Sequence, residues 1–121
     1  MLCVSTSDTV DIRPGKDGYC SVSYYIRWDG EISRCISLGS ETGEWEYTTL
    51  SEEDYMKLYA FAQDAYENNT YAYLTTDKDG TVYCSISYST PEDDEFQIFS
   101  GYLPADNVFC PIIDILDSYF E

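Results

Sequence analysis

Two stretches of the chain alternate apolar and polar residues on both sides of an Asp-Gly pair, over residues 21–38 and 71–88. Alternation with a period of two is typical of strands that bury one face, and turn residues between two such strands predict a β-hairpin. The alternating apolar and aromatic positions of the first stretch are Val22, Tyr24, Ile26, Ile32, Ile36 and Leu38.

Loop length decides which residues of the first hairpin face each other. A three-residue loop over 28–30 pairs Ile26 with Ile32 and gathers the apolar side chains on one face, whereas a two-residue turn pairs Ile26 with a serine. We therefore predict the three-residue loop, with its closing glycine in the left-handed conformation. Arg27 and Glu31 then face each other as a cross-strand ion pair. The other predicted pairs are Val22 with Ile36 and Tyr24 with Arg34.

The same loop over 78–80 predicts the second hairpin. It pairs Ala72 with Ile86 and Leu74 with Cys84, again on one face, and makes Gly80 left-handed. On this basis Tyr25, Tyr71, Tyr73 and Tyr83 fall on the face opposite the core.

Helical periodicity follows each strand region. Ser51 is expected to cap the first helix, residues 52–54 place three acids in its first turn, and Asn68-Asn69 ends it. Pro111 suits the first turn of the second helix. The more apolar stripe of the first helix is Tyr55, Leu58, Phe61, Ala62 and Ala65, and the core-facing residues of the second are Ile112, Ile113, Ile115, Leu116, Tyr119 and Phe120.

These elements predict an α+β protein of two successive ββ(β)α units, forming a mostly antiparallel sheet with two helices packed on one face. We expect one domain over 1–121, with similar units over 19–67 and 70–120 and an edge strand around residues 9–12. Whether the two units are a true duplication stays open.

Composition narrows the classes of partner. The chain has 23 acidic residues, 6 basic residues and no His, with a formal net charge of -17 and 17% aromatic residues. Direct binding to nucleic acid or to an anionic membrane requires a basic patch that six scattered cations do not build. A basic protein partner is compatible with this charge, and a homodimer through an edge strand stays open.

Cysteine usage points to a reducing compartment. The five Cys are an odd number and none has C-x-x-C spacing, which argues against a disulfide framework and against a zinc site. Together with the absence of a signal-peptide pattern over residues 1–5 and of a long apolar run, this predicts a cytoplasmic protein.

Known catalytic and metal motifs do not fit the chain. The D-x-D-G around Asp79 resembles part of a calcium loop, but aligning Gly80 with the loop glycine places Thr75 and Ile86 at the first and last ligand positions. A Ser-His or Cys-His pair needs a His that the chain lacks. We therefore predict no cofactor, no metal site and no enzymatic activity.

Acidic loops and tyrosines are the best candidates for a binding surface. A folded chain of this mass exposes about 6,700 Å², so the net charge averages about a quarter of the surface density of duplex DNA. Nucleic-acid mimicry therefore requires the acids to gather on one face, and otherwise they only solvate the surface. The predicted partner-binding residues are Glu41, Glu44, Glu46, Glu92, Asp93, Asp94, Glu95, Tyr25, Tyr73 and Tyr83.

We expect a non-catalytic acidic protein that inhibits or masks a basic, nucleic-acid-handling protein. In general character, though in no particular residues, such a protein resembles phage-encoded inhibitors such as anti-CRISPR proteins. One alternative is an immunity-type or accessory module that recognises its partner through a Tyr-rich sheet face or a strand edge. A second alternative is a hydrolase that uses two carboxylates.

Overall fold

The computed structural model describes residues 1–8, 20–38, 41–76, 82–104 and 106–120. These residues form seven strands and two helices. The strands are β1 (Leu2–Asp8), β2 (Cys20–Ile26), β3 (Glu31–Leu38), β4 (Glu41–Thr42), β5 (Glu46–Thr49), β6 (Val82–Ser89) and β7 (Glu95–Leu103), and the helices are α1 (Glu52–Asn68) and α2 (Cys110–Ser118).

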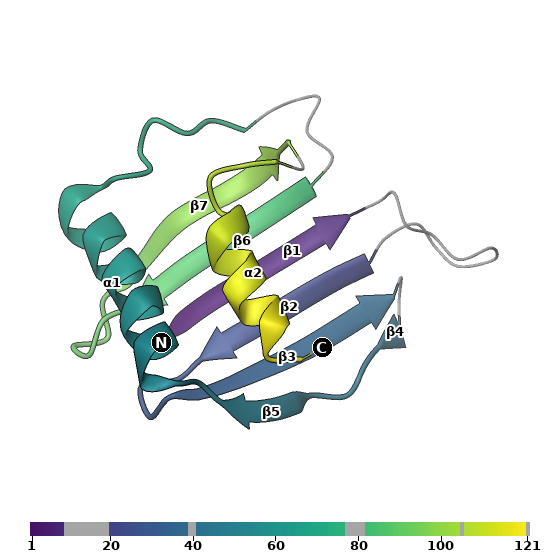
Figure 1. Ribbon diagram of the computed structural model, residues 1–121. Coiled ribbons are helices and arrows are strands. Elements are labelled where there is room, and N and C mark those ends of the chain that lie inside the picture. The colour runs from purple at the N-terminus through teal and green to yellow at the C-terminus, as the bar shows by residue number, and fades with distance from the viewer. Residues whose placement is uncertain (9–19, 39–40, 77–81, 105, 121) are drawn as a thin grey trace.

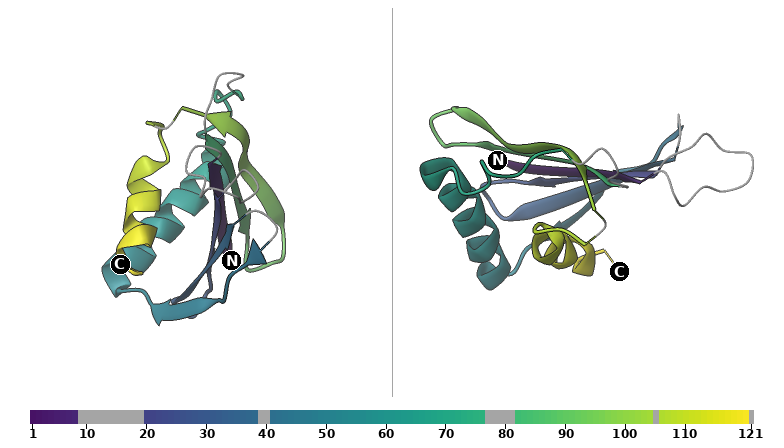
Figure 2. Two further views of the ribbon diagram at one scale, coloured as in Figure 1. Left: turned by 90° about the vertical axis from the view of Figure 1, so that its right-hand side faces the viewer. Right: turned by 90° about the horizontal axis from the view of Figure 1, so that it is seen from above.

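All seven strands join one sheet in the order β4-β3-β2-β1-β6-β7, with β5 also paired to β3 (Figure 1). Every pairing is antiparallel. Both helices lie on the same face of the sheet (Figure 2). The predicted α+β class, with an antiparallel sheet and two helices on one face, is confirmed.

The first hairpin has the predicted register. Ile26 pairs with Ile32, Val22 with Ile36, and Tyr24 with Arg34. The loop is closed by Arg27, whose backbone N–H donates to the carbonyl of Glu31 at 2.9 Å. Gly30 has a φ of 89°, the left-handed conformation that the three-residue loop requires.

The ion pair expected across this hairpin does not form. Arg27 Nε lies 3.9 Å from Asp29 Oδ2, within the loop, instead of facing the carboxylate of Glu31. The short Asp29 side chain also accepts a hydrogen bond from the backbone N–H of Glu31 at 3.0 Å, and this contact holds its carboxylate over the loop.

The second predicted hairpin is wrong. Residues 71–76 are not in a strand, and β6 pairs instead with β1 and β7, so that Ile86 lies between Val4 and Phe99. Tyr71 packs its ring against Phe109 at 5.0 Å, on the helix side of the sheet. The alternation of apolar and polar residues over 71–76 therefore belongs to a connecting segment and not to a strand. The predicted left-handed Gly80 lies outside the described residues.

The second hairpin of the fold is β6–β7, and its turn repeats the geometry of the first. The backbone N–H of Thr90 donates to the Asp94 carbonyl at 2.9 Å, and that of Asp93 donates to the Thr90 carbonyl at 3.0 Å. Asp93 has a φ of 65°, in the left-handed region that Gly30 occupies in the first hairpin. Pro91 directly follows Thr90, which closes the turn, and Asp93 is in the left-handed position. Both residue types are compatible with these positions of the turn.

β1 joins the two hairpins. It pairs with β2 on one side and β6 on the other, so that Leu2 faces both Ile26 and Tyr88. The strand that precedes the first hairpin is thus central. The edge strand predicted around residues 9–12 lies outside the described part of the chain.

The first helix begins and ends as predicted. Ser51 accepts a hydrogen bond from the Asp54 backbone N–H through its hydroxyl at 3.2 Å, and Asn69 follows the helix with a φ of 51°. Leu58, Ala62 and Ala65 are its buried residues, which confirms the predicted stripe. The second helix begins at Cys110, so that a proline stands in its first turn as predicted.

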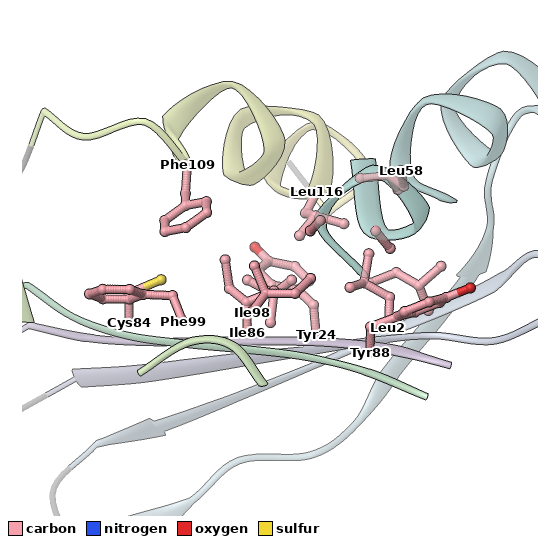
Figure 3. Packing of buried hydrophobic residues seen from close by; sticks show 14 of the residues in the cluster. Leu2, Tyr24, Leu58, Cys84, Ile86, Tyr88, Ile98, Phe99, Phe109 and Leu116 are labelled. Atoms are coloured by element: carbon pink, nitrogen blue, oxygen red, sulfur yellow. The ribbon is translucent and has the colours of Figure 1, made fainter. Parts of the chain in front are cut away.

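The core lies between the helices and one face of the sheet. Phe109 packs above Cys84 and Phe99, while Leu58 and Leu116 lie above the apolar residues of the central strands (Figure 3). Burial raises the pKa of the Cys84 thiol to about 12. This thiol therefore acts as a small apolar side chain of the core.

Candidate functional site

The sheet face opposite the helices is lined by small uncharged residues. Ser23, Ser5, Ser85 and Ser100 face one another in a row across four neighbouring strands. Among the described residues, the charged side chains of this face stand at its end, where Glu31 and Glu95 begin their strands. A chain with 23 acids thus leaves the middle of one sheet face without charge.

An open groove lies at that end of the face. Its volume is about 690 Å³, within the range of roughly 300–1,000 Å³ that is usual for ligand pockets. The residues that line it are Met1, Tyr25, Arg27, Trp28, Asp29, Glu31, Ser33, Trp45 and Tyr47. We call this hollow the aromatic groove, because four of its lining side chains are aromatic.

Strand register brings the aromatic side chains together. Ser33 pairs with Tyr25 on β2 and with Tyr47 on β5, so that both rings stand on the same face on either side of a small residue. Trp45 precedes β5 and stacks on Tyr25, with ring centroids 5.0 Å apart and planes 20° apart. Ser33 is 5% exposed as a result and forms part of the floor of the groove.

The aromatic side chains remain open to solvent in spite of this packing. Tyr25 is 39% exposed, Trp45 37% and Tyr47 63%. Trp28 is 41% exposed as well, although its ring also stacks on Tyr59 of α1 at 4.6 Å. Exposed aromatic rings beside a hollow are typical of protein-binding surfaces.

Charged residues of the first hairpin loop form one rim of the aromatic groove. Asp29 and Glu31 provide carboxylates, and Arg27 provides a guanidinium that pairs loosely with Asp29. A second, smaller hollow of about 360 Å³ adjoins the other side of Trp45 and is lined by Glu44 and Glu46 as well. The aromatic groove itself is therefore lined by two carboxylates and two cations, since the Met1 ammonium lies there as well, and the further acids lie beyond Trp45.

The two predicted acidic segments lie far apart. Glu41 is in β4 and Glu95 begins β7, so the segments stand at opposite edges of the sheet. Five interstrand spacings separate these edges, roughly 24 Å. Glu92, Asp93 and Asp94 form the β6–β7 turn at the corner diagonal to β4 (Figure 1). The predicted acids therefore do not gather into one patch.

Glu46 takes part in a contact within the molecule. Its Oε2 accepts two hydrogen bonds from Arg34, from Nε at 3.0 Å and from Nη2 at 2.5 Å. The Arg34 guanidinium also lies over the Phe120 ring, 4.7 Å from its centroid. This arrangement ties β5 to the sheet and to the end of α2.

Another polar contact lies next to Arg34, under α2. Tyr24 is 1% exposed and donates a hydrogen bond from its hydroxyl to Asp117. Burial, and next the hydrogen bond to Asp117, raise the pKa of Tyr24 above its usual value. Burial and this hydrogen bond both keep the Tyr24 phenol protonated at neutral pH.

Two of the three predicted tyrosines lie on the uncovered sheet face. Tyr25 belongs to the aromatic groove, and Tyr83 packs edge to face on Tyr102 at 5.3 Å, with its hydroxyl 2.9 Å from that of Ser100. Tyr73 is 68% exposed but follows α1 and is not in a strand, so its predicted place on the sheet face is wrong.

Sequence reasoning missed Trp45 and Tyr47 as site residues. Both alternate with Glu44 and Glu46 along the chain. Alternation of aromatic and acidic residues indicates that the aromatic rings share one face. The pairing of β5 with β3 is then needed to bring these rings beside Tyr25.

Within the described residues, no group of three or more Cys, Asp or Glu side chains is arranged to hold a metal ion. Neither described helix is long and apolar enough to cross a membrane. Comparison of the sequence with models of known families and with curated proteins finds no match.

Proposed function

We propose that this protein is a non-catalytic binding protein for a basic, nucleic-acid-handling protein, and that the partner docks at the aromatic groove. The observation that carries the proposal is the position of exposed aromatic side chains around a hollow that also presents the carboxylates of Asp29 and Glu31, in a protein with a net charge of -17. Aromatic anchors supply the contact area, while the surrounding acids attract and orient a cationic partner.

The overall charge supports the same class of partner. A net charge of -17 over 7332 Å² corresponds to one negative charge for about 430 Å². Such a field repels nucleic acid and favours proteins whose own ligand is nucleic acid, because these proteins expose basic surfaces. We place the binding in the cytoplasm, in keeping with the free thiols of Cys3, Cys35 and Cys84.

Salt dependence tests the proposal directly. A fluorescein-labelled peptide of mixed Arg and Lys residues is titrated with the protein at low salt and at about 0.15 M salt. We expect an affinity that falls severalfold with salt, and displacement of the peptide from a short DNA duplex as protein is added. Affinity that does not change with salt, or binding of an acidic peptide of equal length, contradicts the proposal.

A matched pair of charge reversals locates the surface. The first variant combines Glu31→Lys with Glu44→Lys, next to the aromatic groove, and the second combines Glu92→Lys with Glu95→Lys, at the β7 edge of the same end of the sheet. Both change the net charge equally. We expect the first to weaken peptide binding at least tenfold more than the second, since only nearby charges escape screening. Equal losses show that the net charge acts without this site.

The other half of the uncovered face favours a second candidate, an accessory module that recognises its partner through tyrosines. Tyr102 is 49% exposed beside Tyr83, and their neighbours in the sheet are uncharged serines. Recognition by this surface is expected to be insensitive to both charge reversals and to be abolished by Tyr102→Ala. If the Tyr102→Ala variant binds the peptide as tightly as the unmodified protein does, the result argues against this candidate.

A further inference from the structure

We infer that the aromatic groove selects arginine over lysine, with the guanidinium of a partner arginine lying against the exposed Tyr25 and Trp45 rings and donating to the carboxylate of Glu31. This inference rests on the proposed function, because it names the side chain by which a basic partner docks. It assigns an occupant to the groove and a role to each of three residues.

Ring geometry distinguishes the two cations. The near-parallel Tyr25 and Trp45 rings form a rigid aromatic surface that is about two fifths exposed. A guanidinium is planar, weakly hydrated and able to stack on such a surface while its edge donates several hydrogen bonds. A lysine ammonium is strongly hydrated and has no planar face, so it gains less from the same surroundings.

The same combination of groups already holds an arginine elsewhere in the molecule. Arg34 lies over the Phe120 ring at 4.7 Å and donates two hydrogen bonds to Glu46. The aromatic groove presents the equivalent groups on the outer surface: aromatic rings on its floor and side, and a carboxylate on its rim. Its volume of about 690 Å³ leaves room for the arginine and for adjoining peptide.

Arg27 lies where it opposes the binding of a partner arginine. Its guanidinium lies on the rim, 60% exposed, and pairs with Asp29 at 3.9 Å. The Arg27 guanidinium repels an incoming arginine and competes with it for the carboxylates of Asp29 and Glu31. Removal of Arg27 is therefore expected to strengthen the binding of a cation and to weaken the binding of an anion.

The experiment compares four labelled peptides of equal length and sequence context, whose variable positions are all Arg, all Lys, all citrulline or all Glu. Citrulline keeps the shape of arginine without its charge. We expect the Arg peptide to bind about fivefold or more tightly than the Lys peptide, and the citrulline and Glu peptides to bind weakly. Arg27→Ala is expected to raise the affinity for the Arg peptide at least twofold.

Variants of Trp45 show whether the aromatic surface causes the preference. Trp45→Ala is expected to lower the affinity for the Arg peptide to that of the Lys peptide and to leave the Lys peptide within twofold of its original affinity. Trp45→Phe, which keeps a flat ring, is expected to retain part of the preference. Thermal unfolding of each variant confirms that it is folded, and Tyr47→Ala gives an independent test of the groove if Trp45→Ala is unfolded.

The outcomes separate this inference from the proposed function. Equal affinity for the Arg and Lys peptides, both tighter than the Glu peptide, overturns arginine selection and leaves the proposed function in place. A preference for Arg that survives both Trp45→Ala and Tyr47→Ala also overturns it. Failure of both basic peptides to bind more tightly than the Glu peptide overturns the two together, and a Glu peptide whose binding requires Arg27 assigns the groove to an acidic ligand.

Discussion

Trp45 stacks on Tyr25 across the edge of the sheet, with ring centroids 5.0 Å apart and planes 20° apart, although the two residues are twenty positions apart in the chain. The contact fastens the segment between β4 and β5 to the face of β2.

The stack predicts a measurable coupling between these two side chains. Tyr25→Ala, Trp45→Ala and the double variant form a cycle in which the free energy of unfolding is measured by urea denaturation. We expect an interaction energy of about 0.5–1.5 kcal/mol, because aromatic pairs contribute this much beyond the area they bury. A cycle with Tyr102 in place of Tyr25 serves as the control, and additive losses in the first cycle contradict the stack.

Leu58 predicts how much α1 depends on its buried stripe. The side chain is fully buried in the core, whereas Met56 on the same helix is 62% exposed. Leu58→Ala is expected to cost about 2–5 kcal/mol of unfolding free energy through lost contacts and a cavity. Met56→Ala is expected to stay within about 0.5 kcal/mol, and similar losses for the two variants are incompatible with this orientation of the helix.

Tyr119 predicts a link between the two helices. Its hydroxyl donates to Asp54 Oδ2 at 2.5 Å and accepts from the Ser51 backbone N–H at 2.9 Å, so it holds the beginning of α1. Tyr119→Phe is expected to cost roughly 1–3 kcal/mol in chemical denaturation, as for a hydrogen bond to a charged group. Tyr73→Phe, at an exposed position outside the sheet, is the control with no significant expected loss. A Tyr119→Phe protein as stable as the unmodified protein contradicts the link.

Buried phenols predict a loss of stability at high pH. Burial raises the pKa of Tyr24 and of Tyr59 in the folded protein, whereas the unfolded chain releases these protons near the ordinary tyrosine pKa of about 10. Their contribution to stability is therefore complete below about pH 10 and is lost as the pH rises from there toward the folded-state pKa.

The measurement is the free energy of unfolding in urea at several pH values from neutral to alkaline. Tyr24→Phe is expected to flatten the decline above about pH 10, while Tyr47→Phe, at a position 63% exposed, is expected to leave the decline unchanged. An unchanged slope for Tyr24→Phe shows that this phenol ionises alike in the folded and unfolded states.

Local interactions explain which parts of the fold were predictable. The Ser51 cap, the Asn69 stop and the loop closed by Gly30 depend on residues a few positions apart, and these features are present as predicted. The register of β2 and β3 was predictable for a related reason, since a single alignment across the loop places its apolar side chains on one face.

The main error, the predicted pairing of residues 71–76 with β6, arose because several distant strands could pair with β6. The residues of β6 alternate as a strand must, but alternation does not say whether the neighbour is the preceding segment, β1 or β7. The Asp79-Gly80 pair is the stronger turn pattern of the sequence, whereas the turn of the second hairpin runs through the proline and acids of residues 91–94. β1, at the far end of the chain, occupies the place that residues 71–76 were expected to fill.

The sequence by itself determined the α+β class, the first helix with its ends and buried stripe, the proline in the first turn of the second helix, the first hairpin and the excess of negative charge, because each follows from residue type and short-range spacing. Only the tertiary structure decided where the acids and aromatic side chains lie. Insertion of β1 between the hairpins places the two acidic segments at opposite edges, and the pairing of β5 with β3 brings Trp45 and Tyr47 beside Tyr25. Both depend on pairing between segments far apart in the chain, for which no local pattern is sufficient.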